Sequence, residues 1–348
     1  NIRHEITNGA NASGQNTIAG ITWEPRGGTQ LRAATDMLTN DNGRRIGATV
    51  GVDQIWQVND AWTVSGGLAR RTNVNGEDDT LDVAPDAAIG PLDEGTRSPL
   101  TQAEQYASGY FGAAFQADSM AGSARVEARK STSGTRLVAT LGGAREITKA
   151  LSFSVAGRHQ WENISDRGDR EQTDLRIGAA WRPRGEGVVI LNRLDIGHLN
   201  EEGIQDRAKI VNNFTANAML SKKTQLSVYH GIKRVETEFE GAHATALTHL
   251  LGSEIRHDLT KRVDIGFQTT WSHSDATETA QWSYGPSIGF SPKDNIWVSL
   301  GWNVAGFEDD DFEAARYKEE GPYIKLRAKF DQNTAKGLIK ALGLGADQ

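Results

Sequence analysis

Strict alternation of apolar and polar side chains near the end of the chain constrains the fold more than any other feature. In residues 321–330 the two alternating sets are Ile324, Leu326, Ala328 and Phe330 on one face, and Tyr323, Lys325, Arg327 and Lys329 on the other. A period of two residues is that of a β-strand whose faces meet different surroundings. In a soluble sandwich these surroundings are a core and water, and in a transmembrane barrel they are lipid and a wet lumen. The stretch therefore predicts a two-faced strand and leaves two all-β folds open.

Composition narrows the class of protein. The chain has 348 residues, a formal net charge of -7 and a mean hydropathy of -0.51. No apolar run approaches the roughly 20 residues that a spanning helix needs, whereas barrel strands of about 10 alternating residues remain compatible. The absence of cysteine excludes disulfide and thiolate sites, and the mild acidity argues against a nucleic-acid binder. Because the sequence opens at Asn1 without a signal peptide, we expect a mature protein or a fragment of a longer one.

Segments of period two recur along the whole chain, and the lengths of their connections alternate. We count about eighteen such segments, with sixteen as the alternative. Short connections such as 58–61 and 183–187 alternate with generally longer, more acidic ones such as 72–104 and 308–320. Outer-membrane barrels place short turns in the periplasm and long loops outside, and a sandwich has no reason for this alternation. The sequence thus predicts an all-β fold, a single closed antiparallel transmembrane β-barrel over residues 1–331, with both termini periplasmic.

Two smaller patterns accompany the predicted barrel. Residues 332–348 are expected to form a short periplasmic tail, in which apolar residues at helical spacing favour a helix; they are Ala335, Leu338, Ile339 and Leu342. Tryptophans near predicted strand ends suit either interfacial girdles or ordinary sheet positions; they are Trp23, Trp56, Trp62, Trp161, Trp181, Trp271, Trp282 and Trp297.

The predicted lumen face is rich in basic side chains. These are Arg125, Arg129, Arg158, Arg176, Arg182, Arg256, Lys325, Arg327 and Lys329, and the wall also carries Arg32 and Lys233, against Asp36, Asp53, Glu127, Asp195 and Glu254. A wide basic lumen could pass anions, and an internal network of ion pairs that stiffens the wall explains the pattern equally well. The acidic connection 72–104 has the opposite charge, so we expect it to fold inward and occlude the lumen in part.

Few residues point to metal or catalytic chemistry. Two acidic clusters are calcium candidates, with a solvated acidic surface as the favoured alternative; they are Glu77, Asp78 and Asp79, and Glu308, Asp309, Asp310 and Asp311. The eight histidines show no metal-ligand spacing, and neither a hydrolase elbow nor a phosphate loop is present. We therefore predict no catalytic residues, no cofactor other than calcium at these clusters, and no enzyme activity.

Several stretches resemble a known family. They are WQVNDAW (56–62), KIVNNF (209–214), GSEIRHDL (252–259), NIWVSLGWN (295–303) and GFEDDDF (306–312), followed by Tyr317, GPY (321–323) and RAKFD (327–331). The chain resembles the C-terminal outer-membrane β-barrel domain of large bacterial envelope proteins, in which repeated surface-type domains often precede the barrel. The resemblance implies a barrel in the outer membrane and no particular activity.

The last strand also resembles the closing strand that serves as the assembly signal of outer-membrane barrels. The residues that carry this likeness are Tyr323, Leu326 and Phe330, although the signal normally ends the chain and here eighteen residues follow Phe330. The expected partners are outer-membrane lipid and lipopolysaccharide, the barrel assembly machinery, and periplasmic or surface domains of the same or another chain.

These observations predict an anchor or translocation barrel for a larger envelope protein, with a partly occluded lumen. The alternative is a general or weakly anion-selective diffusion porin, and a barrel enzyme is the least favoured class.

Overall fold

The fold consists almost entirely of β-strands. The structure is a computed structural model, and it describes residues 2–8, 13–40, 43–75, 105–165, 168–183, 187–293, 296–315 and 319–328. The strands are β1 (Ile2–Asn8), β2 (Ser13–Arg26), β3 (Thr29–Asn40), β4 (Gly43–Gln57), β5 (Trp62–Asn75), β6 (Tyr106–Ala117), β7 (Met120–Ser131), β8 (Gly134–Thr148), β9 (Leu151–Ile164), β10 (Gly168–Trp181), β11 (Val188–Glu201), β12 (Gln205–Met219), β13 (Thr224–Phe239), β14 (Ala242–Asp258), β15 (Val263–Ser274), β16 (Thr279–Lys293), β17 (Ile296–Asn303) and β18 (Gly321–Ala328). One short 3₁₀ helix, η2 (Glu313–Ala315), precedes β18. Within the described residues, no helix has the length and apolarity needed to cross a membrane.

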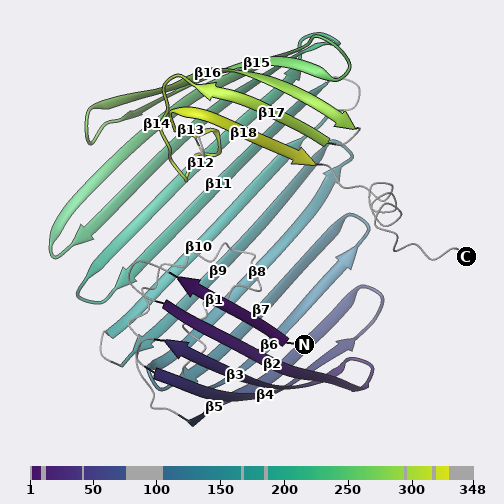
Figure 1. The fold of residues 1–348 in the computed structure, drawn as a ribbon, viewed down its shortest axis with the longest axis vertical. Helices are drawn as coiled ribbons and strands as arrows, with labels where there is room; N and C mark the ends of the chain where they lie inside the picture. Colours follow the sequence, from purple (N-terminus) through teal and green to yellow (C-terminus); the bar gives the residue numbers. More distant parts are fainter. Residues whose placement is uncertain are drawn as a thin grey trace, which may run out of the picture.

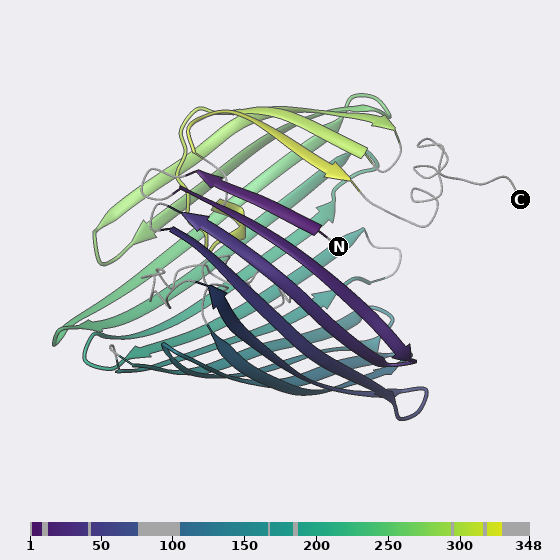
Figure 2. The same cartoon turned by 60° about the horizontal axis from the view of Figure 1, so that its bottom comes forward.

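Each strand pairs antiparallel with the next one along the chain, from β1–β2 to β17–β18. The resulting meander is strongly curved (Figures 1 and 2), and Figure 1 shows β1 and β18 apart from each other. In the part of the chain that the structure describes, no pairing joins β18 to β1, so the sheet is open along this seam. The predicted all-β antiparallel architecture is confirmed.

The convex face of the sheet is apolar. Exposed aliphatic and aromatic side chains alternate with charged and polar side chains that point to the concave face, as the period of two requires. The exposed apolar set includes Ile21, Val50, Leu68, Phe111, Val126, Leu141, Val155, Ile177, Ile324 and Leu326. Ile324 and Leu326 are 75% and 67% exposed. An apolar surface this extensive is unstable in water, so the convex face requires an apolar environment or a covering partner.

Exposed tryptophans lie near both edges of the apolar face. Near the short turns they are Trp23, Trp56, Trp62 and Trp181, and toward the opposite edge they are Trp161, Trp282 and Trp302. Trp271 pairs with Trp282 across β15 and β16. Trp297 differs from the predicted girdle residues, because its indole donates a hydrogen bond to Asp264 on the concave face and lies under the Arg256 guanidinium.

Three of the short turns share a capping device. One side chain at or beside the turn accepts hydrogen bonds from backbone N–H groups two and three positions later, as in an Asx or Thr turn. Asn59 Oδ1 lies 2.9 Å from the N–H nitrogen of Ala61 and 2.8 Å from that of Trp62. Thr148 and Thr260 repeat the arrangement with distances of 3.0 to 3.2 Å. These local bonds satisfy backbone donors that no neighbouring strand reaches.

The connections at the opposite edge are shorter than predicted. Only two residues separate β13 from β14, although this connection belongs to the set that we expected to be generally longer, and the strands run through residues 236–239. The reason is that Glu236, Thr237 and Glu238 continue to alternate and pair with residues of β14. Long connections remain between β5 and β6 and between β17 and β18.

Candidate functional site

The connection between β17 and β18 does not lie outside the sheet, contrary to our prediction for the long loops. Residues 304–315, which we call the inward segment, cross the concave side and contact β11, β12 and β13 (Figure 2). β11, β12 and β13 are not neighbours of β17 in the sheet. The segment therefore crosses the interior that the curved sheet surrounds. It is therefore the strongest candidate for a functional element.

The inward segment begins and turns through local backbone bonds. Val304 and Ala305 form a bridge with Tyr284 of β16, with N–O distances of 2.9 and 3.2 Å. Asp309 then caps the turn, because its carboxylate accepts the N–H of Asp311 at 3.0 Å and its carbonyl accepts the N–H of Phe312 at 3.2 Å. A cap of this kind is a preferred role of aspartate, so part of the acidic cluster serves the local fold.

An apolar cluster anchors the inward segment to the wall. Phe312 and Ala315 are fully buried, and with Phe307 and Ala314 they pack on side chains of the wall, which are Val211, Leu250 and Tyr229. Gly231 of β13 makes room for the Phe312 ring, because a Cβ at Gly231 would lie 2.5 and 2.6 Å from two ring carbons. Full burial of a phenylalanine side chain contributes about 1.5–3 kcal/mol, so this contact fixes the position of the segment.

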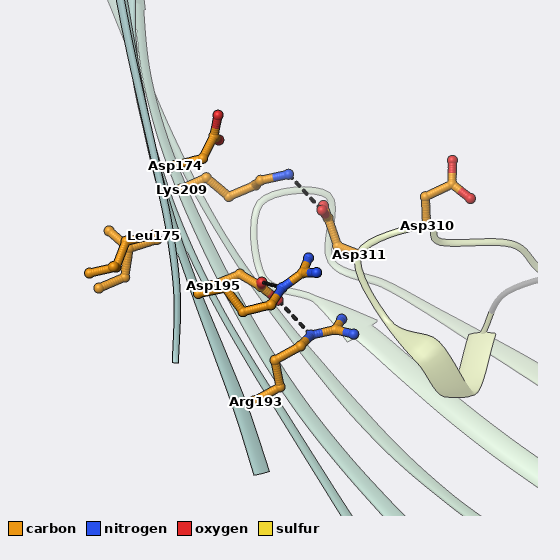
Figure 3. Close-up of a pocket in the computed structure, with 10 residues that line it drawn as sticks. Asp174, Leu175, Arg193, Asp195, Lys209, Asp310 and Asp311 are labelled. Atoms are coloured by element: carbon orange, nitrogen blue, oxygen red, sulfur yellow. Dashed lines mark hydrogen bonds and ion pairs between the residues drawn. The ribbon is translucent and has the colours of Figure 1, made fainter. Parts of the chain in front are cut away.

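Ion pairs surround the apolar anchor. Lys209 Nζ of β12 lies 2.6 Å from Asp311 Oδ1 (Figure 3). Lys233 Nζ of β13 lies 3.4 Å from Asp311 Oδ2. Lys233 also pairs with Asp309. Each lysine thus joins the wall to the acidic turn, with Lys233 in contact with two carboxylates.

Two further wall residues hold the end of the turn. Asn213 donates a hydrogen bond to the Asp311 carbonyl at 3.0 Å and accepts the N–H of Glu313 at 3.4 Å. Arg193 of β11 pairs with Glu313 and, through Nε, with Asp195 Oδ2 at 2.7 Å. The Asn213 side chain is buried, so these bonds satisfy an amide that would otherwise be unpaired.

The two lysines determine the charge state of Asp311. Burial alone raises the pKa of this carboxyl group, but the hydrogen bond and charge of Lys209, together with the charge of Lys233, outweigh burial and hold the pKa below its ordinary value. The carboxylate is therefore ionised at neutral pH, and its pairing with the wall is present throughout the physiological range.

A small cleft of about 140 Å³ lies between the inward segment and the wall. Charged groups of both signs line it, and Figure 3 shows Lys209, Arg193 and Asp195 directed toward the segment while Leu175 points to the other face of the sheet. Further lining residues are Asp174, Arg176, Asp310 and Asp311. The mixed charges give the cleft no strong preference for one sign of ion.

The predicted basic residues lie mainly on the concave face, where carboxylates accompany them. Arg125 pairs with Glu127 at 3.0 Å, Arg176 pairs with Asp195, and Arg256 pairs with Glu254 and Asp264. Arg158 donates to Gln160, and the guanidinium of Arg129 lies 4.0 Å from the centre of the Tyr106 ring. Arg32 and Arg71 pair with Asp53 and Asp36 at 2.6 Å. Ion pairing therefore dominates the described concave face.

Other predicted site residues fall elsewhere. Arg182 is exposed in the turn after β10, and the backbones of Tyr323, Lys325, Leu326 and Arg327 belong to β18. Glu77, Asp78, Asp79, Lys329, Phe330 and the tail 332–348 lie outside the described residues, as does most of the acidic connection 72–104. In the described part of the chain, no group of three or more potential ligands could hold a metal ion.

Sequence reasoning did not assign the anchor residues. The alternation of polar and apolar residues was interpreted one strand at a time. It therefore gave no role to Phe312, Asn213 or Gly231, which meet only in the folded protein. The available signal was the position of Phe307 and Phe312 on either side of a run of four acidic residues, because a solvated loop rarely carries two phenylalanines.

The comparisons with known proteins bear on the fold. No protein-family model matches the chain, and no curated protein sequence matches it. Among solved structures, the FrpB iron transporter from Neisseria meningitidis (F3-3 variant) matches with a TM-score of 0.50 and 10% identity, over 84% of this chain and 58% of that one. The apoprotein of its F5-1 variant matches with a TM-score of 0.50 and 11% identity, over 90% of this chain and 64% of that one.

A third structure, the outer membrane protein OmpT of Vibrio cholerae, matches with a TM-score of 0.35 and 9% identity over 82% of this chain and 91% of that one. The likeness to the FrpB structures and the all-β sheet together show the fold, that of an outer-membrane β-barrel. The chain spans less than two thirds of the length of these two transporters.

Proposed function

We propose that the chain closes into an outer-membrane β-barrel whose lumen is occluded by the inward segment, and that it serves as the membrane anchor or translocation domain of a larger envelope protein. The observation that carries the proposal is the attachment of the inward segment, through the buried Phe312 and the Lys209 and Lys233 ion pairs. An anchor must not leak, and a segment fixed by both apolar and ionic contacts blocks the interior more firmly than a solvated loop.

Closure of the proposed barrel joins β18 to β1 and makes a wall of eighteen strands. An even number of strands lets an antiparallel meander close with its termini at one edge, which we assign to the periplasm because the short turns lie there. Residues 1–331 form the barrel and 332–348 a periplasmic tail in this proposal. Tyr323, Leu326 and Phe330 act as the signal for the assembly machinery.

The surroundings of the proposed barrel follow from its surface. The apolar convex face contacts outer-membrane lipid, and the tryptophans near its edges lie at the two interfaces, the outer one next to lipopolysaccharide. Upstream surface domains of the same chain, or another chain, are the cargo. We propose neither catalytic activity nor a cofactor, because Asp309 and Asp311 of the calcium candidate cluster are engaged by lysine ammonium groups.

A diffusion porin is the second candidate, and one observation favours it. Charged side chains on β3–β10 remain accessible, with Arg32 and Arg125 side chains 49% and 38% exposed, so a hydrated path beside the inward segment is compatible with the wall. In a porin, the inward segment would narrow this hydrated path instead of blocking it.

Planar-bilayer recordings distinguish the two candidates. If the chain is an anchor, we expect a low conductance for the wild type. We expect a large, stable rise in conductance when residues 306–315 are replaced by a Gly–Ser linker. A matched replacement in the short turn 220–223 should leave the conductance low. If the wild type already conducts as an open pore and the linker variant conducts equally, the anchor proposal fails and the porin replaces it.

A further inference from the structure

One part of the convex face differs from the rest of the apolar belt. At mid-height on β5–β8 the belt is apolar, with Leu68, Phe111, Val126 and Leu141, while Arg70 and His159 on the same face lie nearer the edge opposite the short turns. On β11–β13 it carries Asn192, Asn212 and His230, which we call the polar patch. Their neighbours Arg193, Asn213 and Gly231 face the inward segment, so the alternation of a strand directs the polar patch to the convex side.

The polar patch lies at mid-height of the belt. His230 is the seventh residue of β13 counted from the short-turn end, whereas Trp271 and Trp161, toward the opposite edge, are the ninth of β15 and the eleventh of β9. A barrel strand crosses the hydrocarbon layer in about 9–11 residues. His230 therefore lies within the layer, between the apolar Phe214 and Leu251, which pair with it on the two adjacent strands.

Lipid cannot satisfy the hydrogen-bonding groups of the polar patch. Asn192 and Asn212 form a reciprocal amide pair with N–O distances of 3.1 and 3.2 Å, which leaves an N–H of Asn192 without a described acceptor. Among the described residues, no hydrogen bond is found for the His230 imidazole, which is exposed. Polar side chains in the hydrocarbon layer are costly, and ionisable ones there normally face protein or water.

We infer that the convex surface of β10–β14 is an interface with a second copy of this chain. The inference rests on the proposed membrane location. Amide and neutral imidazole groups each carry both a donor and an acceptor, so the same patch on a copy related by a two-fold axis supplies their complements. Five strands at ~4.8 Å spacing over an apolar height of ~25 Å span ~600 Å² of the curved wall on each copy, so the pair buries up to ~1,200 Å², the lower end of the range of standard interfaces.

The absence of cysteine from these 348 residues allows a clean crosslinking test in native membranes. His230→Cys places a thiol in the polar patch, and the control Val126→Cys places one at the same height on β7, between the apolar Phe111 and Ala139. A short bis-maleimide should convert His230→Cys to a species of twice the mass and leave Val126→Cys monomeric. Equal, low crosslinking of both variants would overturn the interface, and a product of any other mass would assign the surface to a different partner.

A second measurement separates an interface from a polar defect in a lipid-facing wall. The triple variant Asn192→Leu, Asn212→Leu and His230→Leu removes the hydrogen-bonding groups and keeps apolar volume. At an interface this change should weaken self-association roughly tenfold or more, as measured by sedimentation in mild detergent. Unchanged association of the variant would overturn the inference. Failure of the wild type to fractionate with membranes would instead refute the proposed function, and the interface with it.

Discussion

At the scale of single residues, the position of the inward segment depends on side-chain volume in the wall. Gly231 is the residue that lets the Phe312 ring reach the wall. The variant Gly231→Ala adds a methyl group where ring carbons lie 2.5 and 2.6 Å from the new atom, and such overpacking typically costs about 1–3 kcal/mol. We expect the segment to detach part of the time, which bilayer recordings would register as frequent openings.

Gly142→Ala is the matched control for this change. Gly142 lies on β8, away from the inward segment, and a Cβ there would meet its nearest atom at an ordinary 3.6 Å. The control should keep the low conductance of the wild type. Identical recordings from both variants would show that the Phe312 contact does not hold the segment in place.

The charge of Asp311 gives a second residue-scale prediction, on pH. The pKa of this carboxyl group is lowered in the folded protein, so its contribution to attachment is complete above the unfolded pKa of about 3.9 and is lost as the pH falls through the lower folded value. The segment should therefore stay attached at pH 7 and loosen below about pH 4. Conductance measured from pH 7 to pH 3 tests this.

Other carboxylates of the wall titrate in the same range, so a control is required. Asp311→Asn removes the titrating group and keeps the size of the side chain. We expect this variant to open more often than the wild type already at pH 7 and to show a smaller change on acidification. A pH response as large as that of the wild type would assign the effect to other groups.

At the scale of the element, alternation within each strand was predictable, and contacts between distant segments were not. The two faces of β18 follow directly from Ile324 and Leu326 alternating with Tyr323 and Lys325. The inward path of residues 304–315 depends on Val211, Gly231 and Leu250, which lie on three other strands. A one-dimensional pattern does not contain that three-dimensional contact, so the acidic cluster alone indicated a solvated loop.

The lipid-facing side of β18 can be tested with Ile324→Arg. Ile324 is 75% exposed and pairs with Leu300 in the middle of β17. An arginine on this face costs ~2–4 kcal/mol near the midplane of a bilayer, so we expect less protein in the membrane fraction and a loss of resistance to unheated SDS. Lys325→Gln, on the next residue and the other face, should assemble normally. Normal assembly of Ile324→Arg would argue against lipid contact at β18.

At the scale of the whole molecule, the remaining question is which edge of the barrel faces outward. The chain has no cysteine, so single cysteines report on position without background. Lys222 lies in the turn between β12 and β13, and Thr277 lies at the opposite edge between β15 and β16, and both are exposed. The proposed orientation puts Thr277 outside the cell and Lys222 in the periplasm.

An impermeant maleimide applied to intact cells should therefore label Thr277→Cys and leave Lys222→Cys unlabelled until the outer membrane is opened. The physical basis is that the inward segment closes the barrel interior, so the reagent cannot reach the periplasmic turns through the lumen. Labelling of Lys222→Cys alone would reverse the orientation and place the termini outside. Labelling of both sites in intact cells would show that the reagent passes through an open lumen. That result would contradict both the occlusion of the barrel and its function as an anchor.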